Sequence, residues 1–363
     1  MRDELAGQLL DKLLTWSAEE QAQWMADLRR LAAYKYDDYE GFAAGERFFE
    51  SFARWLGQFE SADARRRLVG FVRSELIFVS RDELNHAIAC VYPDFIKRTL
   101  VVRAAEEVGL SPFSVSAVVN TNAFRTLRRK TLYLGLSDGA RLDRLRRASP
   151  ELSHEQFWLS PELGPHAVST MAEKLSEAIT EHSLDGEPRF RHVVLVDDFY
   201  GSGTSLLSRK EDGTWGGKLY RARDHLNSVL RSGDNPLLEA DADVTVVIYV
   251  ASAQAESHIR DTLEVFEPTW RLHVVQQLPA SLPVADPELC ALSDWFFDDV
   301  LIDKHKKERV PLGYKSAALP LVMHHNTPNN SISPLWADST ERQGGNSRHA
   351  LFPRYERHHV DRP

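Results

Sequence analysis

The pattern of apolar and polar positions changes its period along the chain of 363 residues. In the first third, apolar residues recur at helical spacing, as in Trp24, Leu28 and Leu31 and again in a stripe over 68–79. These stripes predict amphipathic helices, and we expect residues 1–115 to be all-helical. The region carries no recognisable chemistry, so its expected role is packing, oligomerisation or contact with a partner.

Beyond this region, short apolar runs alternate with amphipathic stretches. The predicted strands cover 131–136, 192–197, 244–250, 271–276 and 317–323, and the predicted helices cover 168–181, 217–231, 254–266 and 286–302. Strands that alternate with helices favour an α/β fold with a mostly parallel sheet and helices on both faces. We expect this domain to span 116–325, with a tail or hood over 326–363. An insertion at 208–217 is expected to form a flap or a partner contact.

The strand predicted at 192–197 ends in two adjacent carboxylates, Asp197 and Asp198, and a loop of small residues follows. The loop contains Gly201, Ser202, Gly203, Thr204 and Ser205. Ligands of open α/β sheets bind at the carboxyl ends of strands, and glycines, hydroxyls and backbone N–H groups suit a phosphate there. The two carboxylates would repel a phosphate in direct contact. They suit sugar hydroxyls, or a hydrated magnesium ion held jointly with ligand oxygens.

Other motifs for phosphate binding or nucleophilic attack do not fit this segment. A P-loop requires a Lys before its Ser or Thr, and a nucleophile elbow requires the spacing Gly-x-Ser-x-Gly. An aspartate nucleophile of the dehalogenase-like type would be followed by a second Asp two positions on, where this chain has Phe199. The remaining alternative is an ordinary strand-to-turn junction whose aspartates cap the turn.

Residues 192–205 resemble the PRPP-binding motif of type I phosphoribosyltransferases: four apolar residues, two acidic, two apolar, then a small residue and Ser-Gly-Thr-Ser. The resemblance implies that Asp197 and Asp198 bind the ribose 2′- and 3′-hydroxyls and that 201–205 hold the 5′-phosphate. Magnesium would be bound indirectly through the two acids. Transfer at the anomeric carbon passes through an oxocarbenium-like transition state, which fixed carboxylates stabilise without acting as nucleophiles.

A second loop follows the strand predicted at 131–136. It contains Ser137, Asp138, Gly139 and Arg141, and it corresponds to the pyrophosphate loop that the resemblance implies. Asp138 departs from the usual composition of that loop. The loop is flanked by further basic residues, namely Arg125, Arg128, Arg129, Lys130, Arg144, Arg146 and Arg147. They indicate either a polyanionic ligand or a solvated, Arg-rich helix face.

A third candidate cluster, His324, His325 and Asn326, follows the last predicted strand. The carboxyl end of that strand should lie at the same edge as the phosphate loop, so we expect one His to hydrogen-bond the base or acceptor or to act in acid–base catalysis. Asn326, together with Tyr200, is the candidate contact for the base or acceptor. Zinc is disfavoured, because adjacent strand residues point to opposite faces and Cys ligands are lacking. A structural role at the strand end is the alternative.

Composition narrows the class of protein. A formal charge of −9 and a pI near 5.9 argue against a general affinity for nucleic acid. The chain has two cysteines, Cys90 and Cys290, too few for a disulfide framework or a cysteine zinc site. No signal peptide and no apolar stretch of membrane-spanning length is recognisable, so we predict a cytoplasmic protein without a membrane partner.

With its three motifs, the segment from 120 to 355 is similar to phosphoribosyltransferase-like effector domains of bacterial conflict systems, both anti-phage and retron-associated. The resemblance implies an antiviral effector enzyme that makes or breaks an N-glycosidic bond at a phosphoribosyl group, with PRPP or a phosphoribosyl nucleotide as substrate. A homo-oligomer and a protein or ribonucleoprotein partner at the helical region are expected. The alternative is a non-catalytic sensor of PRPP or a nucleotide that regulates a partner through the helical region.

Overall fold

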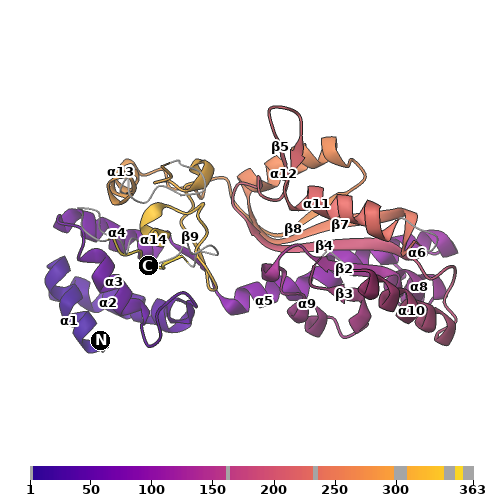
Figure 1. Ribbon diagram of the computed structural model, residues 1–363. Helices are drawn as coiled ribbons and strands as arrows, with labels where there is room; N and C mark the ends of the chain where they lie inside the picture. The colour runs from indigo at the N-terminus through magenta and orange to yellow at the C-terminus, as the bar shows by residue number, and fades with distance from the viewer. Residues whose placement is uncertain (1–2, 161–163, 232–235, 298–308, 339–347, 355–363) are drawn as a thin grey trace. The chain divides into compact units, whose positions relative to one another are not determined.

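The computed structural model describes residues 3–160, 164–231, 236–297, 309–338 and 348–354 (Figure 1). The chain divides into two compact units. Unit 1 comprises Met1–Leu84 and Ala280–Pro363, and unit 2 comprises Asn85–Pro279. Unit 2 is therefore inserted into the chain of unit 1. This division differs from the boundaries near 115 and 325 that the sequence pattern suggested.

Unit 1 is built mainly from helices around an aromatic core. The described helices of four or more residues are α1 (Asp3–Leu14), α2 (Ala18–Tyr34), α3 (Phe48–Leu56), α4 (Ala62–Ser74), α13 (Pro287–Phe296) and α14 (Ser333–Trp336). Ser17 and Glu20 form a capping box that starts α2. Phe48 and Phe52 of α3 are buried and stack with ring centroids 5.1 Å apart.

Residues 348–354, the last described part of the tail predicted at 326–363, belong to this core. Leu351 and Phe352 are fully buried, and the Phe352 ring stacks on Phe48 at 5.9 Å. The Tyr39 hydroxyl donates hydrogen bonds to the carbonyl oxygens of Phe352 and Pro353. The segment 348–354 is thus part of the packing of unit 1 and does not form a separate hood.

A short parallel sheet corrects two further expectations. Its strands are β1 (Ile77–Val79) and β9 (Leu321–Met323), paired from Ile77 with Leu321 to Val79 with Met323. The amino-terminal region is therefore not all-helical, because α4 ends at Ser74 and the end of the stripe over 68–79 is a strand. The strand predicted at 317–323 pairs with β1 and is not part of the main sheet.

Unit 2 contains the main sheet. Five described strands run parallel in the order β3-β2-β4-β7-β8. They are β2 (Thr131–Gly135), β3 (Phe157–Trp158), β4 (Phe190–Tyr200), β7 (Leu238–Ser252) and β8 (Arg271–Leu278). The central strands are largely apolar, as expected of strands buried on both faces, and β4 and β7 contain runs of β-branched residues. The predicted strands at 131–136, 192–197, 244–250 and 271–276 are confirmed.

Helices cover both faces of the sheet. The helices of unit 2 are α5 (Arg81–Cys90, which begins in unit 1), the π-helical η2 (Val91–Lys97), α6 (Arg98–Val108), α7 (Val115–Val119), α8 (Asn122–Arg129), α9 (Leu142–Ala148), α10 (Pro165–Glu181), α11 (Lys218–His225), η5 (Leu226–Leu230) and α12 (Ala253–Phe266). Alternate side chains of the strands pack with α10, α11 and α12 in one core. Figure 1 shows α11 and α12 on one side of the sheet and α9 on the other. The predicted α/β fold with helices on both faces is confirmed.

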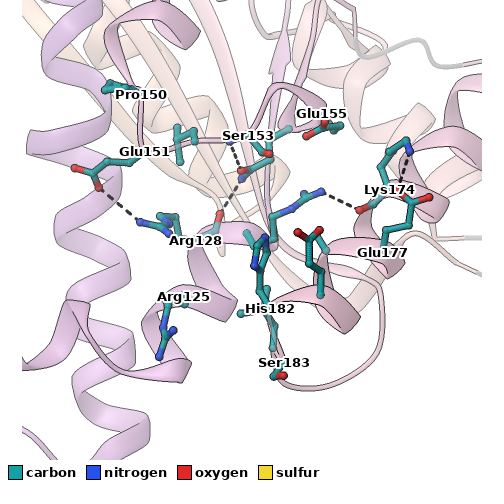
Figure 2. Close-up of a pocket in the computed structure, with 16 residues that line it drawn as sticks. Arg125, Arg128, Pro150, Glu151, Ser153, Glu155, Lys174, Glu177, His182 and Ser183 are labelled. Atoms are coloured by element: carbon teal, nitrogen blue, oxygen red, sulfur yellow. Dashed lines mark hydrogen bonds and ion pairs between the residues drawn. The ribbon is translucent and has the colours of Figure 1, made fainter.

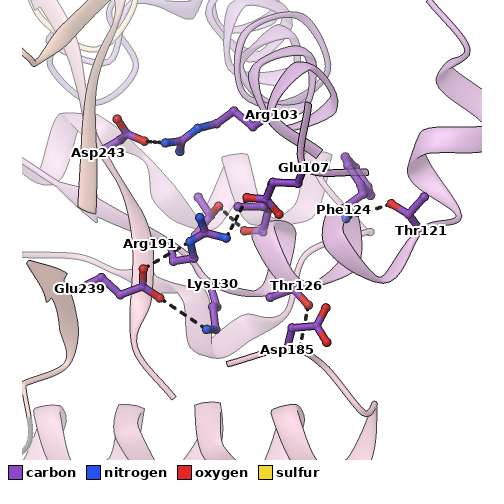
Figure 3. Close-up of polar contacts among 12 residues, drawn as sticks. Arg103, Glu107, Thr121, Phe124, Thr126, Lys130, Asp185, Arg191, Glu239 and Asp243 are labelled. Atoms are coloured by element: carbon purple, nitrogen blue, oxygen red, sulfur yellow. Dashed lines mark hydrogen bonds and ion pairs between the residues drawn. The ribbon is translucent and has the colours of Figure 1, made fainter. Parts of the chain in front are cut away.

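Ion pairs join α6 to the amino ends of β4 and β7, as Figure 3 shows. Arg191 lies between Glu107, at 3.0 Å, and Glu239, at 3.3 Å. Glu239 also contacts the buried ammonium of Lys130 at 3.5 Å. Burial lowers the pKa of Lys130, and Glu239 acts in the opposite sense. Each of these four charged residues thus has an opposite charge beside it.

The insertion predicted at 208–217 contains an antiparallel hairpin of β5 (Ser208–Arg209) and β6 (Trp215–Gly216). It separates the loop after β4 from α11, and its tip projects from the unit (Figure 1). The Arg209 guanidinium lies over the Trp215 ring, 5.5 Å from its centroid. Trp215 in turn packs on Phe266 of α12, so the hairpin is attached to the helix layer. Among the described helices none is both long and apolar enough to span a lipid bilayer.

Candidate active site

The order of the strands in the main sheet indicates where a ligand would bind. In chain order the five strands of the main sheet occupy the spatial order 2-1-3-4-5, so the direction of winding reverses between β2 and β4. In open α/β sheets, ligands bind outside the carboxyl ends of the strands at this switch point. The residues that follow β2 and end β4 are the two predicted loops, 137–141 and 197–205. Topology therefore brings together the two motifs that the sequence singled out.

Asp197 is enclosed at the end of β4. Its side chain is 0% exposed, and it accepts hydrogen bonds from the hydroxyls of Ser137 and Tyr200. The ammonium of Lys218 lies 2.5 Å from its Oδ2 atom. Burial raises the pKa of Asp197, as does the neighbouring Asp198, whereas Lys218 and Ser137 act to lower it. An ionised carboxylate can accept all three of these hydrogen bonds.

Asp198 occupies a different environment, although it is the next residue. It is half-buried, and its carboxylate lies against the backbone of Gly139 in the first loop. A methyl group at Gly139 would overlap the carboxylate of Asp198, so only glycine permits this approach. The structure therefore brings the second acid and the predicted pyrophosphate loop into contact.

The loop 201–205 packs closely against α12. Gly203 has a φ of +77°, and a Cβ atom there would lie 2.9 Å from Cγ1 of Ile259. Ser252, the last residue of β7, donates its hydroxyl to the carbonyl of Gly201 and caps α12 by accepting from Ala255 N–H. Thr204 is half-buried and Ser205 is exposed, so the loop meets solvent at its carboxyl-terminal side.

The loop 137–141 is held from the sheet side. The hydroxyl of Tyr249, a fully buried residue of β7, donates to the carbonyl of Ala140 at 2.5 Å. Arg141 is the N-cap residue of α9 and has a φ of +44°, and its Nε is buried without a hydrogen-bond partner among the described residues. Asp138 is exposed. An unpartnered guanidinium nitrogen beside Gly139 suits an anionic group.

A family comparison agrees with this geometry. The model of the PRTase-CE family matches residues 52–354, well over half of the chain. The chain belongs to the PRTase-CE family. The match indicates a phosphoribosyltransferase-like domain, in keeping with the parallel sheet and its two loops. No curated protein and no solved structure matches the chain at a significant level.

The third predicted cluster of this PRTase-CE chain lies in unit 1. His324, His325 and Asn326 follow β9, which pairs with β1, so they do not follow a strand of the main sheet. His324 is fully buried, and its backbone N–H donates to the carbonyl of Val79. The reason for expecting a catalytic His at the phosphate loop was a shared sheet, and that sheet is not formed.

Tyr200 is also placed differently from the prediction. It is buried, and its hydroxyl donates to Asp197 instead of facing a base. Burial and the nearby Asp197 raise the pKa of Tyr200 well above its usual value, so the phenol remains protonated. Sequence reasoning missed Lys218 and Tyr249 entirely. Lys218 is the first residue of α11, and no local spacing indicates which acid its side chain meets.

The basic residues on the two sides of the loop 137–141 have separate surroundings. Those of 125–130 lie at the amino end of β2, on the opposite edge of the sheet from the acids. There a cavity of about 670 Å³ is lined by charges of both signs (Figure 2). Within it, Lys174 pairs with Glu177 at 2.7 Å, and Arg128 lies 4.0 Å from Glu151. These residues form a mixed, largely compensated surface and not a polyanion site at the loop.

Proposed function

We propose that this protein is an enzyme that makes or breaks an N-glycosidic bond at a 5-phosphoribosyl group. The observation that carries the proposal is the contact between Asp198 and the backbone of Gly139 at the topological switch point. An acid suited to a ribose and a glycine loop suited to a pyrophosphate face one crevice there. The family match supports a phosphoribosyltransferase-like domain.

The residues divide the ligand between them. The hydroxyls and backbone N–H groups of 202–205 would hold the 5′-phosphate, and the Gly139 N–H with the Arg141 guanidinium would hold the pyrophosphate or its equivalent. Asp198 would stabilise positive charge on the ribose ring in the transition state and does not attack it. Most of the rate enhancement would come from orienting the two reactants.

Magnesium fits this site through Asp198. Because Asp197 is enclosed, Asp198 is the acid of the pair that lies toward the crevice. One carboxylate, ligand phosphates and water form a common environment for Mg²⁺. The ion would neutralise charge on the pyrophosphate while the glycosidic bond forms or breaks. Within the described residues no cluster of three or more His, Cys, Asp or Glu side chains is placed to bind a metal, so ligand oxygens would complete its shell.

The biological setting is part of the proposal. The resemblance to effector domains of conflict systems supports a role in antiviral defence, with unit 1 as the surface for a protein or ribonucleoprotein partner. A non-catalytic sensor of PRPP or a nucleotide remains the second candidate. The internal pairing of Asp197 with Lys218 favours it, because a ligand that binds without turnover needs fewer accessible acids.

The test is an assay of products by mass spectrometry. The protein is incubated with PRPP, nucleotides, NAD or RNA in separate reactions, each of which contains magnesium. We expect a phosphoribosyl product with the wild type and a rate at least about a hundredfold lower with Asp198→Asn. Asp261→Asn, the same substitution at an exposed position of α12, is the matched control and should keep the wild-type rate. Ligand binding without turnover in every variant would support the sensor instead.

A further inference from the structure

The motif has two acids, and the structure gives them unequal access to a ligand. Asp197 is completely enclosed by Ser137, Tyr200 and Lys218, whereas Asp198 is half-buried and contacts the loop 137–141. A sugar hydroxyl could reach Asp197 only by displacing one of these three donors. The segment that carries Lys218 is itself fixed by further contacts.

Lys218 is attached to the phosphate loop through its backbone. Its N–H donates to the carbonyl of Ser205 at 3.2 Å, and the next N–H, of Leu219, donates to the carbonyl of Leu206 at 2.9 Å. Gly217, just before it, has a φ of +101°, and a Cβ atom there would overlap the carbonyl of Leu206. The hairpin therefore returns the chain to the phosphate loop in one defined position.

The side chain of Lys218 continues from this position to Asp197. The ammonium lies 2.5 Å from the carboxylate and 5.4 Å from the centre of the Tyr200 ring. Lys218 thus links the end of the phosphate loop to the strand from which the loop departs. An ion pair in this low-dielectric position has a strong geometric preference, because either charge alone would be poorly solvated.

We propose that Lys218 and Asp197 form an internal ion pair that positions the phosphate loop, and that the sugar of the ligand meets Asp198 and not Asp197. The inference rests on the proposed function, in that the ligand carries a 5-phosphoribosyl group. It makes Lys218 and Asp197 positioning residues and leaves Asp198 as the acid in contact with the sugar.

A double-mutant cycle read with two ligands tests this division. Calorimetry measures the affinity of each variant for inorganic phosphate and for ribose 5-phosphate. The two ligands differ only by the sugar. The variants are Asp197→Asn, Lys218→Met, their combination, the conservative Lys218→Arg, and Asp198→Asn. Each folded variant is checked by its thermal midpoint, because a single substitution leaves a buried charge unpaired.

We expect Asp197→Asn and Lys218→Met each to weaken binding of both ligands by the same factor, about tenfold, since both act through the loop. The combined variant should recover most of this loss, and Lys218→Arg should retain near-wild-type binding. Asp198→Asn should weaken ribose 5-phosphate about tenfold and leave inorganic phosphate unchanged.

Two results would overturn the inference while the proposed function stands. One is an Asp197→Asn variant that loses affinity for ribose 5-phosphate alone, which would place Asp197 at the sugar. The other is a combined variant whose losses simply add, which would mean that the two residues do not act as a pair. If the wild type binds neither ligand, the proposed function fails, and the inference fails with it.

Discussion

The carboxyl and amino ends of the main sheet both carry charged residues, but the residues have different partners. At the amino end, Lys130, Arg191 and Glu239 satisfy one another within the protein. At the carboxyl end, Asp197 is satisfied internally, while Asp198 lies against Gly139 and the Arg141 Nε atom has no hydrogen-bond partner among the described residues. The comparison teaches that charge density alone does not locate a site. The charges to test are those that lie in or against the two glycine-containing loops.

Gly139→Ala should have the largest effect. The added methyl group overlaps the carboxylate of Asp198, so the acid must move away from the sugar position. We expect turnover to fall by about a hundredfold or more, comparable to the loss of one preorganised electrostatic group. Steady-state kinetics with the substrate from the product assay measure this effect. Gly70→Ala is the control, since that Cβ meets nothing within 4 Å, and equal losses in both variants would remove the role of Gly139.

Gly203→Val should weaken phosphate binding by at least about tenfold. Valine disfavours the φ of +77°, at a cost of about 1–3 kcal/mol, and its side chain would meet Ile259 and the backbone of Ala255. The loop must therefore change shape. Calorimetry with inorganic phosphate, combined with a thermal melt, measures both consequences. Gly213→Val, at a φ of +84° in the hairpin with more space, should cost some stability but leave phosphate affinity intact.

At the amino end, His192 should make stability depend on pH. Burial is the main reason that its pKa is lowered to about 3, from 6.5 for an ordinary His, so the folded protein holds it neutral. The unfolded chain binds a proton there below pH 6.5, and stability is therefore lost as pH falls through that value. The loss is about 2 kcal/mol at pH 5. Urea unfolding of wild type and His192→Gln at pH 7 and pH 5 measures it, with exposed His182→Gln as the control.

Lys130→Met should have the smallest effect and should sharpen the comparison most directly. The substitution keeps the buried stem and removes a charge whose burial is itself costly, while Glu239 retains Arg191. We expect a loss of about 1 kcal/mol in unfolding free energy and no change in phosphate affinity. A marked change in phosphate affinity would contradict this expectation and show that the two ends of the sheet are energetically coupled.

The main elements of unit 2 were predictable because they depend on local pattern. Buried parallel strands are continuous apolar runs, and β4 and β7 follow that pattern over their whole central parts. The positions of Asp198, Gly139 and Gly203 follow from the same logic, since loops after parallel strands share one edge. The pattern misled where a strand continued a helical stripe, as in β1, whose partner β9 lies far along the chain.

The sequence by itself determined the alternation of strands and helices, the acidic pair and the glycine-containing loop 201–205, because each depends on residues close together in the chain. Tertiary structure alone decided which acid is enclosed. The ion pair of Lys218 with Asp197 depends on how a hairpin returns to the loop, and the pairing of β9 with β1 decides that His324 does not follow a strand of the main sheet. Both outcomes follow from packing between distant segments, and no spacing along the chain records where such segments meet.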